Sequence, residues 1–544
     1  MRKWTKKLFY ALCLLSLLTL AACSDSSKET TSTNSGGAGT TAKGEKTIYV
    51  GLTNPPGTLN PINAVDLSSQ IVSGILFETL YDLDDKLQFQ PKLAESLDSK
   101  DNQNYVLKIN PKANWTDGQP FTADDIVFTL QLMANPKVAS TGLKSLSIIE
   151  GLDKSGILPA GQKEITGLKV VDAKTLTIKT KNPIDPNYLK EQLGVNIRFL
   201  PKHVLKDVKP EELQTNPFMQ NPNVTNGAFK LVKFAKDQYV EFAANKDYYR
   251  GTPKLDKLFF KVLPSANLVA QLQTGEIQMT VPSVGPIAAE DYDKVKNMST
   301  VNLVPGTPIY PQFLYYNVKT LSDVKVRQAI AYAMDRKTIV DKLYKGQGEV
   351  NDGPYSTVHP YYNKNMTNYD YDPKKAKELL KEAGWDFNKT IDFAVPAGMK
   401  TREMQATVMA QNLQSIGLKV KISKYDLPTI LQKGAKHEFD ILLIGIPFQL
   451  DPDTSAFFQT GAPYNFAGYS NPEVDALLDK GKKEADPAKR HEIYAQLVEK
   501  LQQDLPVANL MSSTAPGAVS KKVKNAVPKD LGMFYNIQDW DIEQ

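Results

Sequence analysis

The chain has 544 residues, with 65 Lys and Arg, 60 Asp and Glu, and a formal net charge of +5. Its two cysteines are Cys13 and Cys23, so the chain beyond Cys23 holds no disulfide, thiol nucleophile or cysteine-ligated zinc. The roughly 500 residues that follow the N-terminal segment are typical of about three domains.

Residues 1–22 predict a secretory signal. Four basic residues and no acidic one lie in Met1–Lys7, and an uncharged run of 15 residues follows from Leu8 to Ala22. This run is shorter than the roughly 20 residues that a membrane-spanning helix needs. Removal of the signal lowers the formal charge from +5 to +1, because it takes the four basic residues away. The mature charge predicts no nucleic-acid partner and no attraction to anionic lipid.

The signal ends in Leu20-Ala21-Ala22-Cys23, which resembles the bacterial lipobox. In that motif the cysteine is lipidated and becomes the mature N-terminus, so Cys23 predicts a protein anchored on the extracytoplasmic face of the cell membrane. A plain signal with an incidental cysteine is the alternative. Residues 23–47 lack aromatic residues and are rich in Ser, Thr, Gly, Lys and Glu, which predicts a flexible tether.

The body begins with a predicted strand over 48–52 and a turn at 54–57, and a second strand is predicted over 105–109. Asp117-Gly118 predicts a tight turn. Thr122, followed by acidic residues, predicts the N-cap of a helix, because negative charge is favoured in the first helical turn.

The later half predicts helices that begin at Pro373, Pro472 and Pro487, each preceded by Asp or Asn as N-cap. Strands are predicted between them, over 419–423 and 440–446. The second strand is continuously apolar from its second residue, as expected for a strand covered on both faces. Strands interleaved with helices indicate the mixed α/β class.

Signs of catalysis are absent from the sequence. The four histidines form no His-Glu-x-x-His pair, and neither a Gly-x-Ser-x-Gly elbow nor a P-loop occurs. Gly346-Gln347-Gly348 lacks the third glycine of a dinucleotide loop and is interpreted as the end of a helix. We therefore expect no enzyme activity, no metal site and no cofactor, although a secreted hydrolase remains an alternative class.

Several blocks, spread from about residue 47 to near the C-terminus, resemble the family-5 extracellular solute-binding proteins. These are the oligopeptide- and dipeptide-binding subunits of ABC importers. The blocks that carry the resemblance are Trp115–Asp125, Thr225–Phe229, Val326–Arg336, Ala376–Trp385 and Gly468–Asp475.

The resemblance implies a two-lobe, type II periplasmic-binding-protein-like α/β fold with an extra inserted domain and a ligand cleft between the lobes. The implied domains are domain I (48–75, 204–308 and 506–544), domain II (76–203, the insertion) and domain III (309–505, the second ligand-binding lobe). The chain would cross between the lobes near Pro305–Tyr316 and near Leu505-Pro506.

By the same resemblance, the ligand would contact segments that match 280–283, 313–317 and 445–453. Backbone groups of an extended segment can pair with a bound peptide as an added strand, and aromatic side chains can line its pockets. For the aromatic residues, ordinary core packing is the alternative. The implied ligand-binding residues are Thr280, Ser283, Phe313, Tyr315, Tyr316, Asn317, Ile446, Phe448, Gln449, Asp451 and Asp453.

One position departs from the family pattern. Oligopeptide binders pair the peptide's α-amino group with an aspartate, and Gln449 aligns at that position, with Asp451 and Asp453 displaced. A neutral amide cannot supply a charge-assisted hydrogen bond. Either Asp451 takes over this role, or the protein does not fix the ligand's N-terminus by an ion pair.

The expected function is that of a monomeric, lipid-anchored receptor that captures oligopeptides and delivers them to an ABC transporter permease. Lobe closure over the ligand would shift an open–closed equilibrium. The alternatives are a binder of another solute on the same fold (a nickel complex, haem or an oligosaccharide) and a peptide-sensing lipoprotein without transport.

Overall fold

The computed structural model describes residues 44–84, 86–446 and 448–544, of which Glu45–Gln544 form one compact unit. The predicted signal, Cys23 and most of the predicted tether lie outside the described residues. Strand β1 (Thr47–Leu52) begins inside the range expected for the tether. The reason is that the Lys46 N–H donates to Asp256 at 2.9 Å and the Lys46 ammonium lies 2.6 Å from Asp541. Lys46 and Thr47 therefore belong to the folded body.

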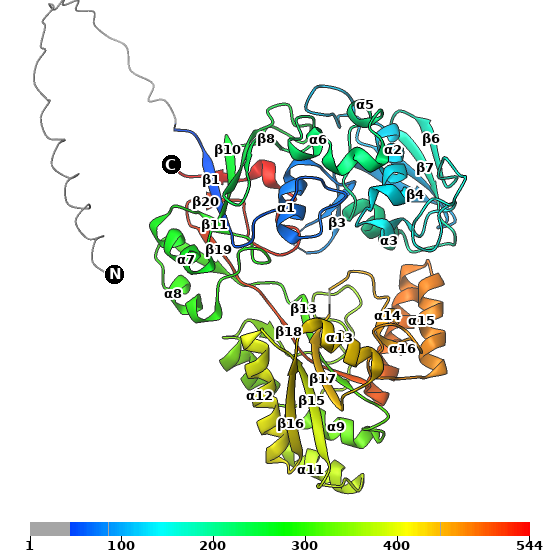
Figure 1. Cartoon of the computed structure of the whole chain (residues 1–544), viewed down its shortest axis with the longest axis vertical. Coiled ribbons are helices and arrows are strands. Elements are labelled where there is room, and N and C mark those ends of the chain that lie inside the picture. The colour runs from blue at the N-terminus through cyan, green and yellow to red at the C-terminus, as the bar shows by residue number, and fades with distance from the viewer. Residues whose placement is uncertain (1–43, 85, 447) are drawn as a thin grey trace, which may run out of the picture. The chain divides into compact units, whose positions relative to one another are not determined.

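A seven-stranded sheet gathers strands from both ends of the chain (Figure 1). Ile48, Val50 and Leu52 of β1 are fully buried on one face, while Tyr49 packs against a second cluster on the other. At Gly51 a Cβ would lie 2.6 Å from the Leu268 Cδ1 atom, so the side chains of a helix pack closely over this position of β1. In sheet order the strands are β12 (Val301–Val304), β19 (Gly517–Ser520), β11 (Met279–Thr280), β1, β10 (Lys257–Val262), β9 (Tyr239–Ala244) and β8 (Phe229–Ala235).

A four-stranded antiparallel sheet and several short helices complete this part of the molecule. The sheet consists of β4 (Ala94–Ser99), β5 (Asn104–Ile109), β7 (Thr175–Lys179) and β6 (Leu168–Asp172), and β2 (Tyr81–Leu83) pairs with β3 (Phe89–Pro91). The helices are α1 (Leu67–Leu76), α2 (Ala123–Ala134), α3 (Leu143–Leu146), α4 (Pro186–Leu189), the π-helix η2 (Lys190–Val195), α5 (Lys202–Leu205), α6 (Pro217–Gln220), α7 (Ser265–Thr274) and α8 (Tyr292–Lys296).

A six-stranded sheet organises the rest of the chain, and α12 runs along β15 and β16 (Figure 1). Its strands, in sheet order, are β14 (Gly348–Glu349), β18 (Val507–Ser513), β13 (Tyr310–Tyr316), β17 (Ile441–Gly445), β15 (Thr390–Pro396) and β16 (Lys419–Tyr425). The helices are α9 (Val324–Ala333), α10 (Arg336–Thr338), α11 (Pro373–Glu382), α12 (Lys400–Ser415), α13 (Leu427–Lys436), α14 (Ser455–Phe458), α15 (Pro472–Lys483) and α16 (Pro487–Asp504).

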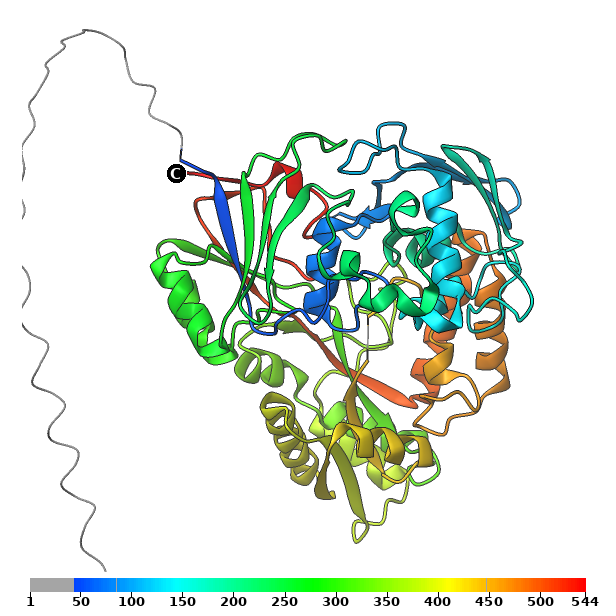
Figure 2. The same ribbon diagram turned by 45° about the horizontal axis from the view of Figure 1, so that its top comes forward.

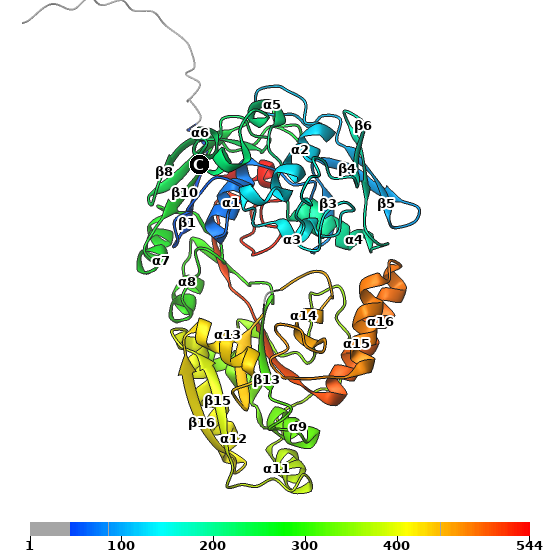
Figure 3. The same cartoon turned by 45° about the vertical axis from the view of Figure 1, so that its right-hand side comes forward.

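The three helix starts predicted at Pro373, Pro472 and Pro487 are confirmed. In α11, α15 and α16 the preceding Asp or Asn accepts hydrogen bonds from the first turn, and proline occupies the first helical position. Figure 3 shows α15 and α16 side by side. The strand predicted over 440–446 is β17, which pairs with a neighbour on each edge and is buried over its first four residues.

The apolar residues form separate cores in two lobes. The cores around the seven- and four-stranded sheets hold residues from 48–301 and 518–540, which define lobe A. Those around the six-stranded sheet hold residues from 313–511, which define lobe B. A small cluster joins the lobes, in which Leu83 and Leu87 of lobe A meet Leu450 of lobe B.

The chain crosses between the lobes twice. It passes from β12 to β13 over residues 305–309, within the segment predicted for the first crossing. The sequence predicts the return near Leu505-Pro506, but β18 pairs along its length with β13 and so remains in lobe B. The return follows β18, over residues 514–516, and Figure 2 shows the orange-red strand leading to the upper sheet. The division into domains I, II and III stays a prediction.

The tryptophan of the resemblance is a scaffold residue. Trp115 is fully buried, and its indole N–H donates to the Asp125 carboxylate at 3.3 Å. Gly118 adopts the positive φ of 87° that the predicted turn needs. Among the helices of the described residues, none is long and apolar enough to span a bilayer.

Candidate functional site

A cavity of about 740 Å³ lies between residues of the two lobes. Lobe A contributes Lys144, Ser145, Tyr188, Glu191, Gln192 and Asn196. Lobe B contributes side chains that follow β17 and others from α13 and the segment around α14. The volume lies within the range of about 300–1,000 Å³ that is typical of small-molecule pockets.

Part of the lobe B side of this cavity is an apolar wall. Leu427, Leu431 and Tyr464 line it although they are 52%, 37% and 47% exposed. Tyr315 and Phe466 also line the cavity and pack against each other, with 5.5 Å between ring centroids. Exposed apolar side chains gathered around one cavity indicate a surface that another molecule covers.

Six of the eleven predicted site residues line the 740 Å³ cavity, and the other five lie elsewhere. Those that line the 740 Å³ cavity are Tyr315, Ile446, Phe448, Gln449, Asp451 and Asp453. Tyr316 points to the opposite face of β13, into the other lobe B core, because side chains alternate along a strand. Thr280 and Asn317 are buried and bond to backbone, Thr280 by accepting from the Ala518 N–H and Asn317 by donating to His437 and Phe439 carbonyls. A structural role accounts for these three residues.

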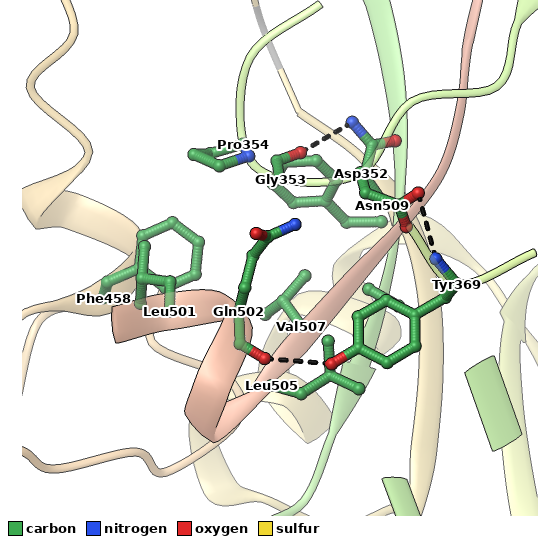
Figure 4. Close-up of a pocket in the computed structure, with 12 residues that line it drawn as sticks. Asp352, Gly353, Pro354, Tyr369, Phe458, Leu501, Gln502, Leu505, Val507 and Asn509 are labelled. Atoms are coloured by element: carbon green, nitrogen blue, oxygen red, sulfur yellow. Dashed lines mark hydrogen bonds between the residues drawn. The ribbon is translucent and has the colours of Figure 1, made fainter. Parts of the chain in front are cut away.

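Phe313 lines a different and much smaller cavity, which Figure 4 shows. Its volume is about 20 Å³, close to the room that one water needs. Around it Asn509 donates to the Gly353 carbonyl at 3.0 Å, and the Tyr369 hydroxyl donates to the Gln502 carbonyl at 3.0 Å. This cavity lies within lobe B and is too small for a solute.

A buried ion cluster lies beside the 740 Å³ cavity, where the lobes meet. The Arg490 guanidinium of lobe B lies 2.7 Å from the Asp451 carboxylate of lobe B and 3.4 Å from the Asp185 carboxylate of lobe A. All three side chains are at most 6% exposed. Burial alone disfavours the charged guanidinium, but the adjacent Asp451 raises the pKa of Arg490. The Asp451 carboxylate is therefore neutralised by an internal partner.

Glu191, on the π-helix η2 of lobe A, also contacts the loop that carries Asp451. Its carboxylate oxygens accept the backbone N–H groups of Leu450 and Asp451 at 3.1 and 3.0 Å. Burial, together with the negative charge of Asp451, raises the pKa of Glu191 to about 7. The side chain thus joins the lobes and has a carboxyl that titrates near neutral pH.

The second displaced aspartate is also engaged locally. Asp453 accepts the Ser455 N–H at 3.0 Å and a hydrogen bond from the Ser455 hydroxyl. Asp451 in turn accepts the Asp453 N–H at 2.9 Å. These hydrogen bonds fix the turn before α14, so both aspartates have a structural role that does not depend on a ligand.

Sequence reasoning missed the residues that neutralise or bridge this loop. Arg490 lies near the start of α16 and belongs to no recognisable motif. Asp185 and Glu191 belong to the predicted insertion. Arg402, a further cation of the cavity, donates to the Gln312 side chain at 3.0 Å. No sequence signal singles these residues out, since each gains its role from contacts with distant segments.

The described residues contain no group of three or more His, Cys, Asp or Glu side chains placed to hold a metal ion. His359 is buried against Tyr355, with 4.4 Å between ring centroids. Burial lowers the pKa of His359 to about 3, so it is neutral at physiological pH.

The sequence profile of bacterial extracellular solute-binding proteins, family 5 (middle region), matches residues 88–468. The chain belongs to this family. It is a solute-binding protein of the oligopeptide- and dipeptide-binding type that serves ABC importers, and it is not an enzyme. The prediction of family and of a non-catalytic protein is thereby confirmed.

Family-5 relatives cover almost the whole chain. The oligopeptide-binding protein AppA of Bacillus subtilis is 28% identical over 99% of this chain and 99% of its own length. Heme-binding protein A of Haemophilus influenzae is 27% identical over 96% of this chain and 97% of its own.

Two solved family-5 structures are similar to this one. AppA of Bacillus subtilis in complex with a nonapeptide is 26% identical, with a TM-score of 0.68 over 92% of this chain and all of that one. NikZ of Campylobacter jejuni in complex with Ni(L-His) is also 26% identical, with a TM-score of 0.69 over 91% of this chain and 99% of that one. They confirm the predicted α/β periplasmic-binding-protein fold, which carries different solutes in different family members.

Proposed function

We propose that this protein captures oligopeptides in the 740 Å³ cavity and delivers them to the permease of an ABC importer. The observation that carries the proposal is the position of the cavity, between two lobes with separate cores and with exposed Leu427, Leu431 and Tyr464 on one wall. A peptide offers apolar side chains for that wall and backbone groups for the polar side. The nonapeptide complex of AppA supports a peptide as the solute.

The first experiment identifies the solute that co-purifies with the chain. The protein is purified under mild conditions and unfolded, and the released molecules are analysed by mass spectrometry. A mixture of peptides of different sequence is the expected result. A single nickel complex, haem or an oligosaccharide as the dominant solute would overturn the proposal.

The bound peptide's N-terminus, in this proposal, is not fixed by an ion pair with Asp451. That carboxylate already faces Arg490 at 2.7 Å, and Gln449, which aligns with the family aspartate, is neutral. A long peptide whose ends project from the cavity needs no such pair. Of the predicted site residues, we retain as ligand contacts those that line the cavity: Tyr315, Ile446, Phe448, Gln449, Asp451 and Asp453.

N-terminal acetylation tests this point. Titration calorimetry with the free and acetylated forms of one co-purified peptide is expected to give dissociation constants within about threefold of each other. If Asp451 held the α-amino group, acetylation would remove a charge-assisted hydrogen bond worth about 1.5–3 kcal/mol. A weakening of about ten- to hundredfold that Asp451→Asn reproduces with the free peptide would therefore contradict the proposal.

The proposal includes the lipid anchor at Cys23, which lies outside the described residues. The lipobox-like Leu20-Ala21-Ala22-Cys23 supports it. Cys23→Ser is expected to release the protein from the membrane fraction and to leave peptide binding intact. Cys13→Ser, inside the predicted signal, is the matched control. Full membrane retention of Cys23→Ser in a detergent-partition assay would count against the anchor.

A further inference from the structure

Helix α13 of lobe B has two apolar faces, and only one of them belongs to the core. Ile430 and Gly434 lie one turn apart and are buried, and Ile430 shares a core with Phe466. A Cβ on Gly434 would come within 2.8 Å of the Phe466 ring, so the helix packs closely on that ring. Leu427 and Leu431, also one turn apart, lie on another face of the helix and line the 740 Å³ cavity.

The cavity face of α13 is not needed to hold the helix in place. A surface helix is attached to its protein by one apolar stripe, and its opposite face is normally polar. Leu427 and Leu431 remain 52% and 37% exposed, so packing within lobe B does not account for them. Their exposure calls for an apolar partner from outside lobe B.

Aromatic rings continue this face around the cavity. Tyr464 stacks on Phe457, with 5.9 Å between ring centroids, and lies nearly perpendicular to Phe466, at 6.0 Å. All three rings line the cavity, and Tyr464 remains 47% exposed. Leu427, Leu431, Phe457, Tyr464 and Phe466 together form the apolar wall.

Lobe A does not supply the apolar partner. Among the described residues that lobe A contributes to the cavity, none is aliphatic, and Tyr188 is the one aromatic residue. Closure of the lobes on an empty cavity would therefore set the apolar wall against polar groups, and burial of polar groups without hydrogen bonds costs free energy. A solute that places an apolar side chain on the wall avoids this cost.

A second cavity, of about 520 Å³, adjoins the first in lobe A, since Ser145 and Asn196 line both. Ser283, which the sequence predicts as a ligand contact, lines this second cavity. Its lining mixes apolar with charged side chains, including Glu78 and Lys92, whose carboxylate and ammonium lie 3.0 Å apart. A solute that covers the apolar wall thus has room to continue into lobe A, as a peptide chain does.

We propose that the apolar wall is a specificity subsite for one large aliphatic or aromatic side chain of the captured peptide. The inference rests on the proposed peptide-binding function and deepens it, since it names the class of peptide that binds best. Apolar side chains gain affinity in proportion to the apolar area that leaves water. Leu427, Leu431 and Tyr464 supply most of that area, because they are the exposed members of the wall.

Three pools of synthetic octapeptides test the subsite. All peptides have free termini and no charged side chain, so the pools differ in one side chain only. Seven positions hold random Ser, Thr, Asn, Gln or Gly, and one random position holds Leu in the first pool, Phe in the second and Gln in the third. The purified chain, stripped of solute by unfolding and refolding, is offered equal amounts of the pools, and the retained peptides are counted by mass spectrometry.

The wild-type chain is expected to retain the Leu or the Phe pool at least about tenfold over the Gln pool, which corresponds to about 1.4 kcal/mol. Equal retention of the three pools, or a preference for the Gln pool, would overturn the subsite and leave the proposed function standing. Failure to retain any pool would overturn the proposed function, and the subsite with it.

Variants assign the preference to the apolar wall. Leu431→Asn should reduce it to below about threefold, because the amide replaces apolar area with a hydrated polar group. Gln432→Asn is the matched control, since Gln432 is exposed on the same helix and does not line the cavity. This control should keep the full preference.

Tyr464→Ser tests the aromatic part of the wall in the same way. Its control is Tyr371→Ser, because Tyr371 is 46% exposed in lobe B and does not line the cavity. Thermal unfolding verifies that each variant is folded, and if Leu431→Asn is not, Tyr464→Ser decides. An unchanged preference in the folded wall variants would overturn the assignment.

Discussion

Arg490 and Arg198 both lie near a cavity, but their surroundings differ. Arg490 contacts Asp451 beside the 740 Å³ cavity, and Arg198 lines a second cavity, of about 520 Å³, in lobe A. Arg490 lies within 3.4 Å of two buried carboxylates, whereas Arg198 has no ion pair in the described part of the chain. A buried ion pair supports the fold, because removal of one partner leaves the other buried without a counterion. Arg198 is only partly buried and has no such partner to leave without a counterion.

For Asp451 and for Arg198, the sequence and the structure therefore lead to different expectations. The sequence predicts Asp451 as a ligand contact, but its carboxylate forms an ion pair with Arg490. Arg198 carries no signal in the sequence, and among the described residues its Nε is one of several buried polar atoms without a hydrogen-bond partner.

Removal of Arg490 is expected to have the largest effect. Arg490→Met leaves Asp451 and Asp185 buried without their cation and should lower the free energy of unfolding by about 3–5 kcal/mol. Urea unfolding followed by circular dichroism measures the loss. Lys489→Met, an exposed position on the same helix, is the control and should change stability by less than about 0.5 kcal/mol. Similar losses in the two variants would show that the Arg490 cluster does not support the fold.

Glu191 provides a pH-dependent test of the same cluster. A carboxyl whose pKa is raised from 4.5 to about 7 binds its proton more tightly in the folded protein than in the unfolded chain. The contribution of Glu191 to the free energy of unfolding is therefore largest below about pH 4.5. It declines by about 1–3 kcal/mol in total as the pH rises to 7.

Melting temperatures between pH 4.5 and 7 measure this decline. Glu191→Gln, which cannot ionise, should flatten the profile relative to wild type. Glu164→Gln, at an exposed position, should reproduce the wild-type slope. Parallel profiles for wild type and Glu191→Gln would contradict the environment described for Glu191.

The smallest effect is expected at Arg198. Because its guanidinium is only partly buried and has no ion pair to lose, Arg198→Met should change the free energy of unfolding of the solute-free chain by less than about 1 kcal/mol. Urea unfolding of the solute-free chain measures this change alongside Arg490→Met. A loss above about 2 kcal/mol would show that Arg198 holds the fold together, and the contrast between the two arginines would be lost.

The sequence by itself determined the features that depend on neighbouring residues. An Asp or Asn followed by proline placed the starts of α11, α15 and α16, because both the cap and the fixed φ of proline act within one turn. The apolar run of β17 was predicted for the same kind of reason. The blocks of residues that resemble family 5 placed the chain in its family and thereby gave the two-lobe fold.

Only the tertiary structure decided which charges remain available. Asp185 and Arg490 are 305 positions apart, and Glu191 and Leu450 are 259 apart, so no local pattern could pair them. The alternation along β13 gave Tyr315 to the cavity wall and Tyr316 to a core, once the sheet had assigned the two faces. Electrostatic interactions depend on distance and burial, and both are set by how distant segments pack rather than by their order in the chain.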